Sequence, residues 1–228
     1  MSRAPILKQL AAVSALAALL SGCALLSTPE PVQMYRFGAA AETFEAAPSA
    51  AVGDLRPVSM RRIQFPEASR GDRILTVTGT RAAYLSGARW VSTADQLFTE
   101  SLTGAFSERG RNTRLIGLRE FSRSTLSLDI DVRAFEARYD HDGAAPVVHV
   151  TARGRILHFP ERDVLDERMF IVTRPAAENR VSAIVAAFEA AVTDINGQIV
   201  DWTDTVAADA PVPEDGPDRT SVRTTRSD

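Results

Sequence analysis

The chain of 228 residues contains only one cysteine, Cys23, and only three histidines. A single cysteine excludes a disulfide within the chain, and the set of ligands for a cysteine–histidine zinc site is missing. The sequence also lacks a Gly-x-Ser-x-Gly elbow, a phosphate-binding loop and a paired metal motif. We therefore predict a protein that is not an enzyme, has no cofactor or metal, and is stabilised by ordinary packing.

The sequence has no excess of positive charge. It contains 26 basic and 29 acidic residues, and without Arg3 and Lys8 the balance is 24 against 29, a net charge of −5. A protein that binds a phosphate backbone usually carries the opposite charge, so we predict no nucleic-acid partner. The remaining length suits one domain with flexible ends.

The beginning of the chain is typical of a secretory leader. Arg3 and Lys8 precede an apolar stretch from Leu10 to Leu20, and its length of about ten residues is too short to span a membrane. Ser21-Gly22 then supplies the small residues that a signal peptidase requires immediately before Cys23. The alternative interpretation is an ordinary signal peptide followed by a free or buried thiol.

The stretch Leu20-Ser21-Gly22-Cys23 resembles the lipobox of bacterial lipoproteins. The resemblance implies that residues 1–22 are a signal peptide that is removed, and that Cys23 is diacylated on sulfur and acylated on its new amino group. Each buried methylene contributes about 0.8 kcal/mol, so three chains anchor a protein essentially permanently. The residue after Cys23 is Ala24 and not an aspartate. This resembles the default pattern for sorting lipoproteins to the periplasmic face of the outer membrane.

The rest of the chain divides into a linker, one domain and a tail. Pro29 and Pro31 with small and polar neighbours predict a linker over residues 23–33, the α+β domain is expected over 34–203, and residues 204–228 lack apolar periodicity and are expected to be disordered. Strands are predicted at residues 34–37, 55–65, 73–78, 84–85, 113–117, 125–139, 147–159 and 164–173.

Two amphipathic helices are expected. Ser92 and Asp95 have the spacing of a capping box at the start of the first helix, which Gly110 ends. The second helix is predicted over residues 178–202, where apolar residues recur at helical spacing.

The segments 125–139 and 147–159 predict a long antiparallel hairpin with one buried face, and a bulge is expected near residues 134–136. His149 lies among arginines on the predicted solvent face, where pairing with Asp129 or Asp131 explains it without catalysis. His141 is flanked by two aspartates and a glycine, a pattern that favours a turn over a metal site.

The order of several motifs resembles the ABC-type transport auxiliary lipoprotein component family. These motifs are a lipobox and short linker, the strand of Tyr35, the loop at Phe65-Pro66, and Tyr84 followed by Arg89-Trp90 before an amphipathic helix. Family members often begin that helix with Ala-Glu-Pro-Leu, whereas this chain has Val91-Ser92-Thr93-Ala94. The resemblance covers residues 23–202.

The resemblance implies a noncatalytic auxiliary component of a lipid transport system between the inner and outer membranes. Its partners would be an MCE-domain protein and the ABC permease and ATPase, with the membrane contacted through the lipid anchor and self-association into a ring of subunits as a further expectation. The implied fold is α+β, a mixed and mostly antiparallel sheet with two amphipathic helices packed against it. Tyr35, Tyr84, Arg89 and Trp90 are the candidate partner-contact or structural residues.

Two other interpretations remain open at this point. The same anchor and the absence of catalytic motifs suit an outer-membrane lipoprotein that regulates a cell-wall synthase or an assembly partner. Arg61-Arg62, or Arg81 with Arg89, could contact anionic lipid head groups, although arginines on strands more often belong to a solvated face.

Replacing the single cysteine tests the anchor. We expect Cys23→Ala to release the protein from membranes without unfolding it, because the attachment point precedes the linker. Fractionation of cells into membrane and soluble fractions, with a thermal melt of the released protein, measures both effects. Retention of the variant in the membrane pellet would contradict the lipobox interpretation.

Overall fold

The structure is a computed structural model that describes residues 32–38, 55–116, 124–159 and 162–211. The leader, Cys23, most of the linker and residues 212–228 of the predicted tail lie outside the described residues. The chain divides into two units, residues 1–33 and 34–228, and the following description concerns the second.

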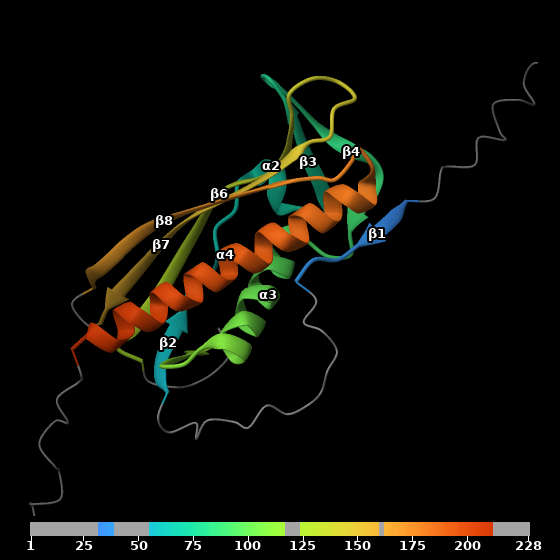
Figure 1. The fold of residues 1–228 in the computed structure, drawn as a ribbon. Helices are drawn as coiled ribbons and strands as arrows, with labels where there is room; N and C mark the ends of the chain where they lie inside the picture. The colour runs from blue at the N-terminus through green and yellow to red at the C-terminus, as the bar shows by residue number, and fades with distance from the viewer. Residues whose placement is uncertain (1–31, 39–54, 117–123, 160–161, 212–228) are drawn as a thin grey trace, which may run out of the picture. The chain divides into compact units, whose positions relative to one another are not determined.

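The central strand of the sheet is β6 (Leu126–Tyr139), which has different neighbours on its two edges (Figure 1). On one edge it pairs antiparallel with β7 (Val147–His158), which pairs antiparallel with β8 (Asp163–Pro175). The other edge is shared, because β2 (Arg56–Met60) lies parallel to the first half of β6 and β3 (Arg73–Thr78) lies parallel to its end. A strand of 14 residues thus joins two smaller strand groups into one sheet.

Three shorter pairings complete the sheet of eight strands. β5 (Thr113–Ile116) lies parallel to β2, β4 (Arg81–Trp90) forms an antiparallel hairpin with β3, and β1 (Gln33–Tyr35) pairs with β4. Beside β3, the four-residue helix α2 (Glu67–Arg70) precedes the strand in sequence. The predicted α+β class with a mixed, mostly antiparallel sheet is confirmed.

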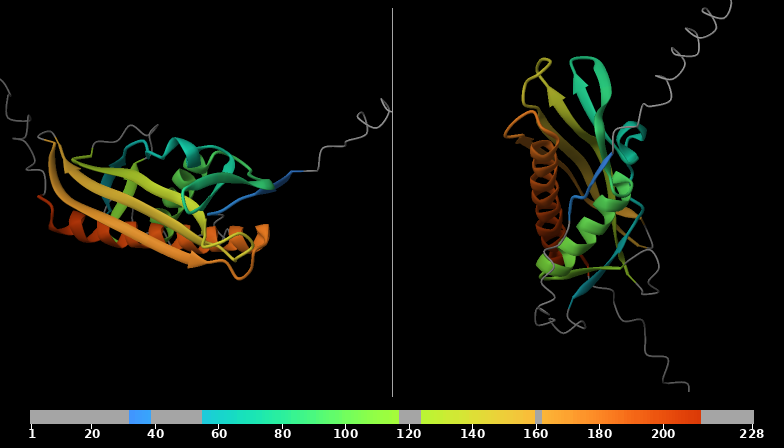
Figure 2. Two further views of the ribbon diagram at one scale, coloured as in Figure 1. Left: turned by 90° about the horizontal axis from the view of Figure 1, so that it is seen from above. Right: turned by 90° about the vertical axis from the view of Figure 1, so that its right-hand side faces the viewer.

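Helices α3 (Ala94–Arg109) and α4 (Val181–Asp209) cover one face of the sheet (Figure 2). The side chains of β6 and β7 that face α4 are almost all apolar and buried, while the opposite face carries charged residues. The alternation follows from the period of two in the sequence. A register shift between Val132 and Ala134 keeps it in step with β7, close to the predicted bulge.

Helix α4 is longer than the sequence pattern predicted, since it ends at Asp209 and not at Trp202. Trp202 packs on Phe170 with ring centroids 5.4 Å apart, and a Cβ placed on Gly154 of β7 would lie 2.8 Å from the Trp202 ring. Although α4 is long and apolar enough to cross a membrane, most of it is buried in the core. It is therefore a core helix of the domain.

Polar groups near the end of α4 explain why the helix continues past Trp202. The Asp204 carboxylate accepts hydrogen bonds from the backbone N–H groups of Arg111 and Asn112 at 2.8 and 3.3 Å, and from Thr113 Oγ1 at 2.5 Å. The guanidinium of Arg56 donates to the carbonyls of Ala207 and of residues 210 and 211. Arg56 thus satisfies the carbonyl of Ala207 in the last turn and two carbonyls just beyond the helix, while Asp204 ties the helix to the turn before β5. The helix can therefore extend through a polar stretch of sequence.

Six aromatic rings form the centre of the core. The Trp90 ring packs edge-on against Phe37 and Phe188, with centroid separations of 4.9 and 5.4 Å, and Phe135 contacts all three. Phe65 joins the cluster by contacts with Phe98 and Phe135. Strands, both long helices and the segment after β1 therefore share one set of contacts.

The residue after Phe37 is held equally closely. The backbone N–H of Gly38 donates to Glu189 Oε2 on α4 at 2.6 Å, and its φ of +67° favours glycine. A Cβ at this position would lie 2.3 Å from Ser101 of α3. Residues 36–38 thus bring the chain into contact with both long helices.

Two further details of the predicted elements are wrong. The capping box at Ser92 is not formed, because Thr93 is the N-cap, its hydroxyl bonds Asp95, and no side chain caps the helix. The second strand ends at Met60 and not at residue 65, since the chain then leaves the ladder and returns only at the isolated bridge between Gln64 and Asp131.

Replacing Trp90 by alanine tests the aromatic core. The side chain is 1% exposed, so we expect Trp90→Ala to reduce the free energy of unfolding by about 3–5 kcal/mol. Val91→Ala is the matched control, because Val91 is adjacent and 52% exposed, and its effect should stay within about 0.5 kcal/mol. Urea unfolding of the three proteins measures the difference, and equal stabilities would show that Trp90 is not a core residue.

Candidate functional site

Two hairpin tips project side by side at one end of the sheet (Figure 2, right). A hollow is lined by residues of both tips. One tip belongs to β3 and β4, and the other follows β6. The hollow has a volume of about 290 Å³ and is also reached by the loop before α4. Its lining consists of Thr76, Thr78, Arg81, Ala83, Tyr84, Leu85, Ser86, Tyr139, Asp142, Gly143 and Asn179.

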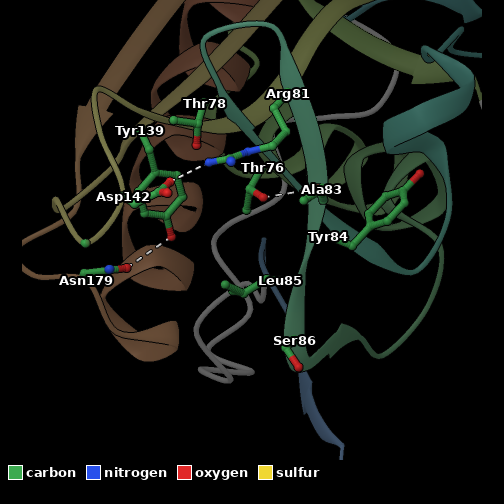
Figure 3. Close-up of a pocket in the computed structure, with 11 residues that line it drawn as sticks. Thr76, Thr78, Arg81, Ala83, Tyr84, Leu85, Ser86, Tyr139, Asp142 and Asn179 are labelled. Atoms are coloured by element: carbon green, nitrogen blue, oxygen red, sulfur yellow. Dashed lines mark hydrogen bonds and ion pairs between the residues drawn. The ribbon is translucent and has the colours of Figure 1, made fainter.

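The tips are shaped by their turns and joined by an ion pair. Gly79 and Gly143 have φ values of +58° and +87°, which favour glycine in these two turns. Arg81 Nη2 lies 2.6 Å from Asp142 Oδ1, so the guanidinium of one hairpin reaches the carboxylate of the other (Figure 3). Both side chains are mostly exposed, and such a pair contributes little to stability. It closes one side of the hollow.

A second link lies deeper in the hollow. Tyr139 ends β6, and its hydroxyl donates to Asn179 Oδ1 at 3.1 Å, in the loop that leads to α4. Partial burial raises the pKa of Tyr139 above its usual value of 10.0, because the phenolate would lose hydration. The phenol of Tyr139 therefore remains a neutral donor at physiological pH.

On the neighbouring strand β3 the Thr76 hydroxyl donates to the Ala83 carbonyl at 3.2 Å.

The polar groups of the lining are hydrogen-bonding groups and one ion pair. The lining offers hydroxyls, one amide and an arginine already paired with an aspartate, and it contains neither a histidine nor a cysteine. Among the residues that the structure describes, no three metal-ligating side chains come together. The hollow can therefore accept polar groups by hydrogen bonding, and no nucleophile in it has a base.

Tyr84 belongs to this hollow by position, but its ring is turned away from Tyr139 and Asp142 (Figure 3). The Arg73 guanidinium carbon lies 3.7 Å from the centroid of the ring, and the hydroxyl donates to the Ala68 carbonyl of α2 at 3.1 Å. Tyr84 is 36% exposed. It therefore links β4 to α2 while part of the ring stays accessible.

The other predicted residues are placed differently. Arg89 is exposed and binds both carboxylate oxygens of Asp72, at 3.1 and 2.9 Å, whereas the adjacent Trp90 points into the core. Tyr35 is half-buried against the core, and its carbonyl accepts from Val91 N at 2.7 Å. The structure does not bring the four aromatic and arginine residues into one site, and Cys23 lies outside the described residues.

The histidines do not converge on a site either. His149 lies opposite Glu136 on the charged face, while His158 lies opposite Leu126 on the other parity of β7. Burial is the main cause that lowers the pKa of His149, Arg138 lowers it further, and Glu136 opposes both. Next to it, Arg155 pairs with Asp129 at 2.5 Å and Arg153 with Asp131 at 3.3 Å. The predicted pairing of His149 with Asp129 or Asp131 is wrong, because both aspartates lie opposite arginines and pair with those instead.

Residues 35–200 match the family model of the ABC-type transport auxiliary lipoprotein component. The chain belongs to this family. The match begins twelve residues after Cys23 and covers the strands and helices described above except the first two residues of β1 and the last nine of α4. The resemblance seen in the sequence is therefore confirmed, and the protein is an auxiliary lipoprotein component of ABC-type transport.

Solved structures share the fold. A crystal structure of a Xanthomonas campestris protein is 24% identical with a TM-score of 0.66, and the alignment covers 78% of this chain and 98% of that one. A crystal structure of an uncharacterized protein is 15% identical with a TM-score of 0.57, covering 76% and 99%. A comparison with curated protein sequences finds no match. These similarities support the fold alone.

Tyr139→Phe tests the link between the hairpin and α4. Loss of the bond to Asn179 should lower the free energy of unfolding by about 0.5–1.5 kcal/mol at pH 7.5. Because the folded pKa is raised, the wild type should lose stability as the pH rises above 10.0, and the variant should lose less. Urea unfolding at pH 7.5 and 10.5 measures both, and parallel losses in the two proteins would contradict the assignment.

Proposed function

We propose that the protein is a noncatalytic auxiliary component of an ABC/MCE-type lipid transport system, anchored to the periplasmic face of the outer membrane through lipidated Cys23. The observation that carries the proposal is the family match over residues 35–200 directly behind the lipobox-like Leu20-Ser21-Gly22-Cys23. An anchor followed by a linker and a folded domain suits a component that holds one end of a transport path at a membrane. Energy would come from the ABC ATPase.

A noncatalytic role is supported by the chemistry of the described surface. The hollow contains hydroxyls and a neutralised ion pair, and the charged face of the sheet is balanced by cross-strand pairs. Such surfaces can bind a protein through hydrogen bonds and shape without carrying out a reaction. The transport partners would be the MCE-domain protein and the permease.

We place the partner contact at the two hairpin tips. β4 is exposed over residues 81–84, yet its position is fixed by the antiparallel ladder with β3 and by the stacking of Arg73 on Tyr84. A preorganised surface loses little conformational entropy on binding, which favours affinity. Exposed Tyr and Arg side chains are also enriched at protein interfaces. Tyr84 is therefore the predicted contact, while Trp90 is a core residue and Tyr35 packs half-buried against the core.

The alternative is a lipoprotein that binds and regulates a cell-wall synthase or an assembly partner. The same anchor and the same lack of catalytic groups fit it. Neighbouring genes distinguish the two, because adjacent permease, ATPase and MCE genes favour transport and an adjacent cell-wall synthase gene favours regulation.

Two adjacent alanines of β4 provide the test of the contact. Ala83 lines the hollow, whereas Ala82 is exposed and does not. We expect Ala83→Trp to fill the hollow and reduce recovery of MCE and ABC components at least tenfold after crosslinking in cells, and Ala82→Trp to leave it unchanged. Both variants should fold, because neither alanine is buried.

The readout separates the hypotheses. Quantitative mass spectrometry of purified crosslinked complexes identifies the partners of the wild type and of each variant. If no MCE or ABC component is recovered with the wild type, the transport proposal fails. If partners are recovered equally with both variants, the transport function stands and the hollow is not the contact.

A further inference from the structure

A cavity that the proposed function does not use lies where the end of α4 meets the beginning of β8 (Figure 1). It has a volume of about 360 Å³. This end of the sheet is opposite the hairpin tips, because Asp163 at the start of β8 pairs with His158, which pairs with Leu126 at the start of β6. The described residues that line the cavity are Leu165, Asp166, Thr205, Val206, Asp209, Ala210 and Pro211.

The lining combines apolar walls with two carboxylates. Four of its seven residues are apolar, Asp166 and Asp209 are acidic, and no basic residue is among the described ones. Asp166 accepts hydrogen bonds from Trp202 Nε1 at 2.7 Å and from the backbone N–H of Glu167 at 2.9 Å. Asp209 has no hydrogen-bond or ion-pair partner in the described part of the chain. Arg56, at the same end of α4, donates to backbone carbonyls and to neither carboxylate.

The end of the helix adds to this negative charge. The last turn of α4 contains no basic residue, and the carboxyl end of a helix carries a partial negative charge. A cavity of this kind suits an apolar side chain that has a cationic group next to it.

The chain itself continues from the cavity. Pro211 belongs to the lining, and residues 212–228 follow it. Gly216-Pro217 is a pair typical of turns, and it lies midway between Pro211 and Val222. A chain that reverses at this pair therefore has the length to bring Val222 back to the cavity from which it started.

The sequence beyond that pair matches the cavity in charge and in apolar content. Residues 219–226 contain three arginines and no acidic residue, so their formal charge is +3. Val222 is the one aliphatic side chain among them, and Arg223 is adjacent to it. A single exposed ion pair contributes little, but a segment attached through a short linker is present at an effective concentration in the millimolar range. Weak apolar and charged contacts then suffice to hold it.

We infer that residues 219–226 dock in the cavity between the end of α4 and the beginning of β8, with Val222 against Val206 and Arg223 paired with Asp209. The family match ends at residue 200, so the α4 wall of the cavity and the docked segment both lie beyond it. The docked segment closes the cavity to other molecules, and only a partner that competes with it gains access. The inference is independent of the proposed function, whose contact lies at the hairpin tips.

Disulfide crosslinking in cells tests the docking. The full-length chain carries Val206→Cys with Val222→Cys and is oxidised in the periplasm. Docking brings the two Cα atoms within the 4.4–6.8 Å that a disulfide usually requires. We expect a crosslink within one chain, seen as a faster band on a non-reducing gel, in at least five times the yield of the control pair. The wild type measures any background from Cys23.

The matched control is Ala208→Cys with Val222→Cys. Ala208 is exposed, lies two residues from Val206 on the same helix and does not line the cavity. Chance encounters give the two pairs similar yields, because their separations along the chain are nearly equal. Equal yields overturn the inference, and so does a disulfide that joins two chains in place of one within a chain.

A charge exchange tests the polar contact in the same assay. Asp209→Arg and Arg223→Asp should each reduce the crosslink between positions 206 and 222 at least threefold, because each places like charges together. The two changes combined restore opposite charges and should restore the crosslink. Losses that do not recover in the combined variant overturn the pairing of Arg223 with Asp209.

Trypsin supplies a measurement without added cysteines. A protease requires an accessible segment, so cleavage of the purified full-length lipoprotein after Arg223 should be at least fivefold faster in Asp209→Asn than in the wild type. Asp218→Asn lies outside the docked segment and should be cleaved like the wild type. Equal rates in Asp209→Asn and the wild type overturn the inference. Capture of transport components is measured separately, so this failure leaves the proposed function unaffected.

Discussion

The packing of α4 along β6, β7 and β8 is the constraint on which the rest of the domain depends. This helix of 29 residues buries one apolar side against the three long strands. Close contact depends on small residues in the strands, since the Trp202 ring occupies space that any side chain at Gly154 would fill. Because β6 is fixed in this way, its far edge can hold two separate strand groups, β2–β5 and β3–β4–β1. The hairpin tips that frame the hollow are the ends of this arrangement. The position of the two tips is therefore set by the sheet, while their turns and the Arg81–Asp142 pair set their local shape.

The sequence predicted the parts of the fold that have a strong period. The alternation in β6 and β7 and the apolar stripe of α4 are local patterns that burial alone explains. The end of α4 could not be predicted, because Asp204 appears polar and helix-ending until Thr113 and the neighbouring N–H groups are seen to satisfy it. Helix α2 was missed because four residues carry no period. A long-range partner thus decides the end of α4, whereas α2 is too short to leave a pattern in the sequence.

The candidate site shows the same limit. The family resemblance singled out Tyr84, and this residue does line the hollow. The opposite wall is built by Tyr139, Asp142 and Asn179, which the sequence did not indicate. Nothing in the sequence relates these positions to β4, since only the parallel pairing of β3 with the end of β6 brings them together. Arg89-Trp90 appears as one motif but serves two unrelated contacts, one with Asp72 and one with the aromatic core. Adjacent residues on a strand face opposite sides, so a sequence motif need not be a site.

The contacts that hold Phe37 and Gly38 in the domain have a mechanical consequence. Phe37 is 1% exposed among the rings of Trp90 and Phe135, and the next backbone N–H is bound by Glu189 of α4. A pull applied to the N-terminal end of β1 therefore reaches the aromatic centre and α4 as soon as the three residues of β1 are displaced. Peeling away β1 alone would not release the domain, because the load must extract a buried ring. The domain is therefore held at its N-terminal end by a buried aromatic side chain.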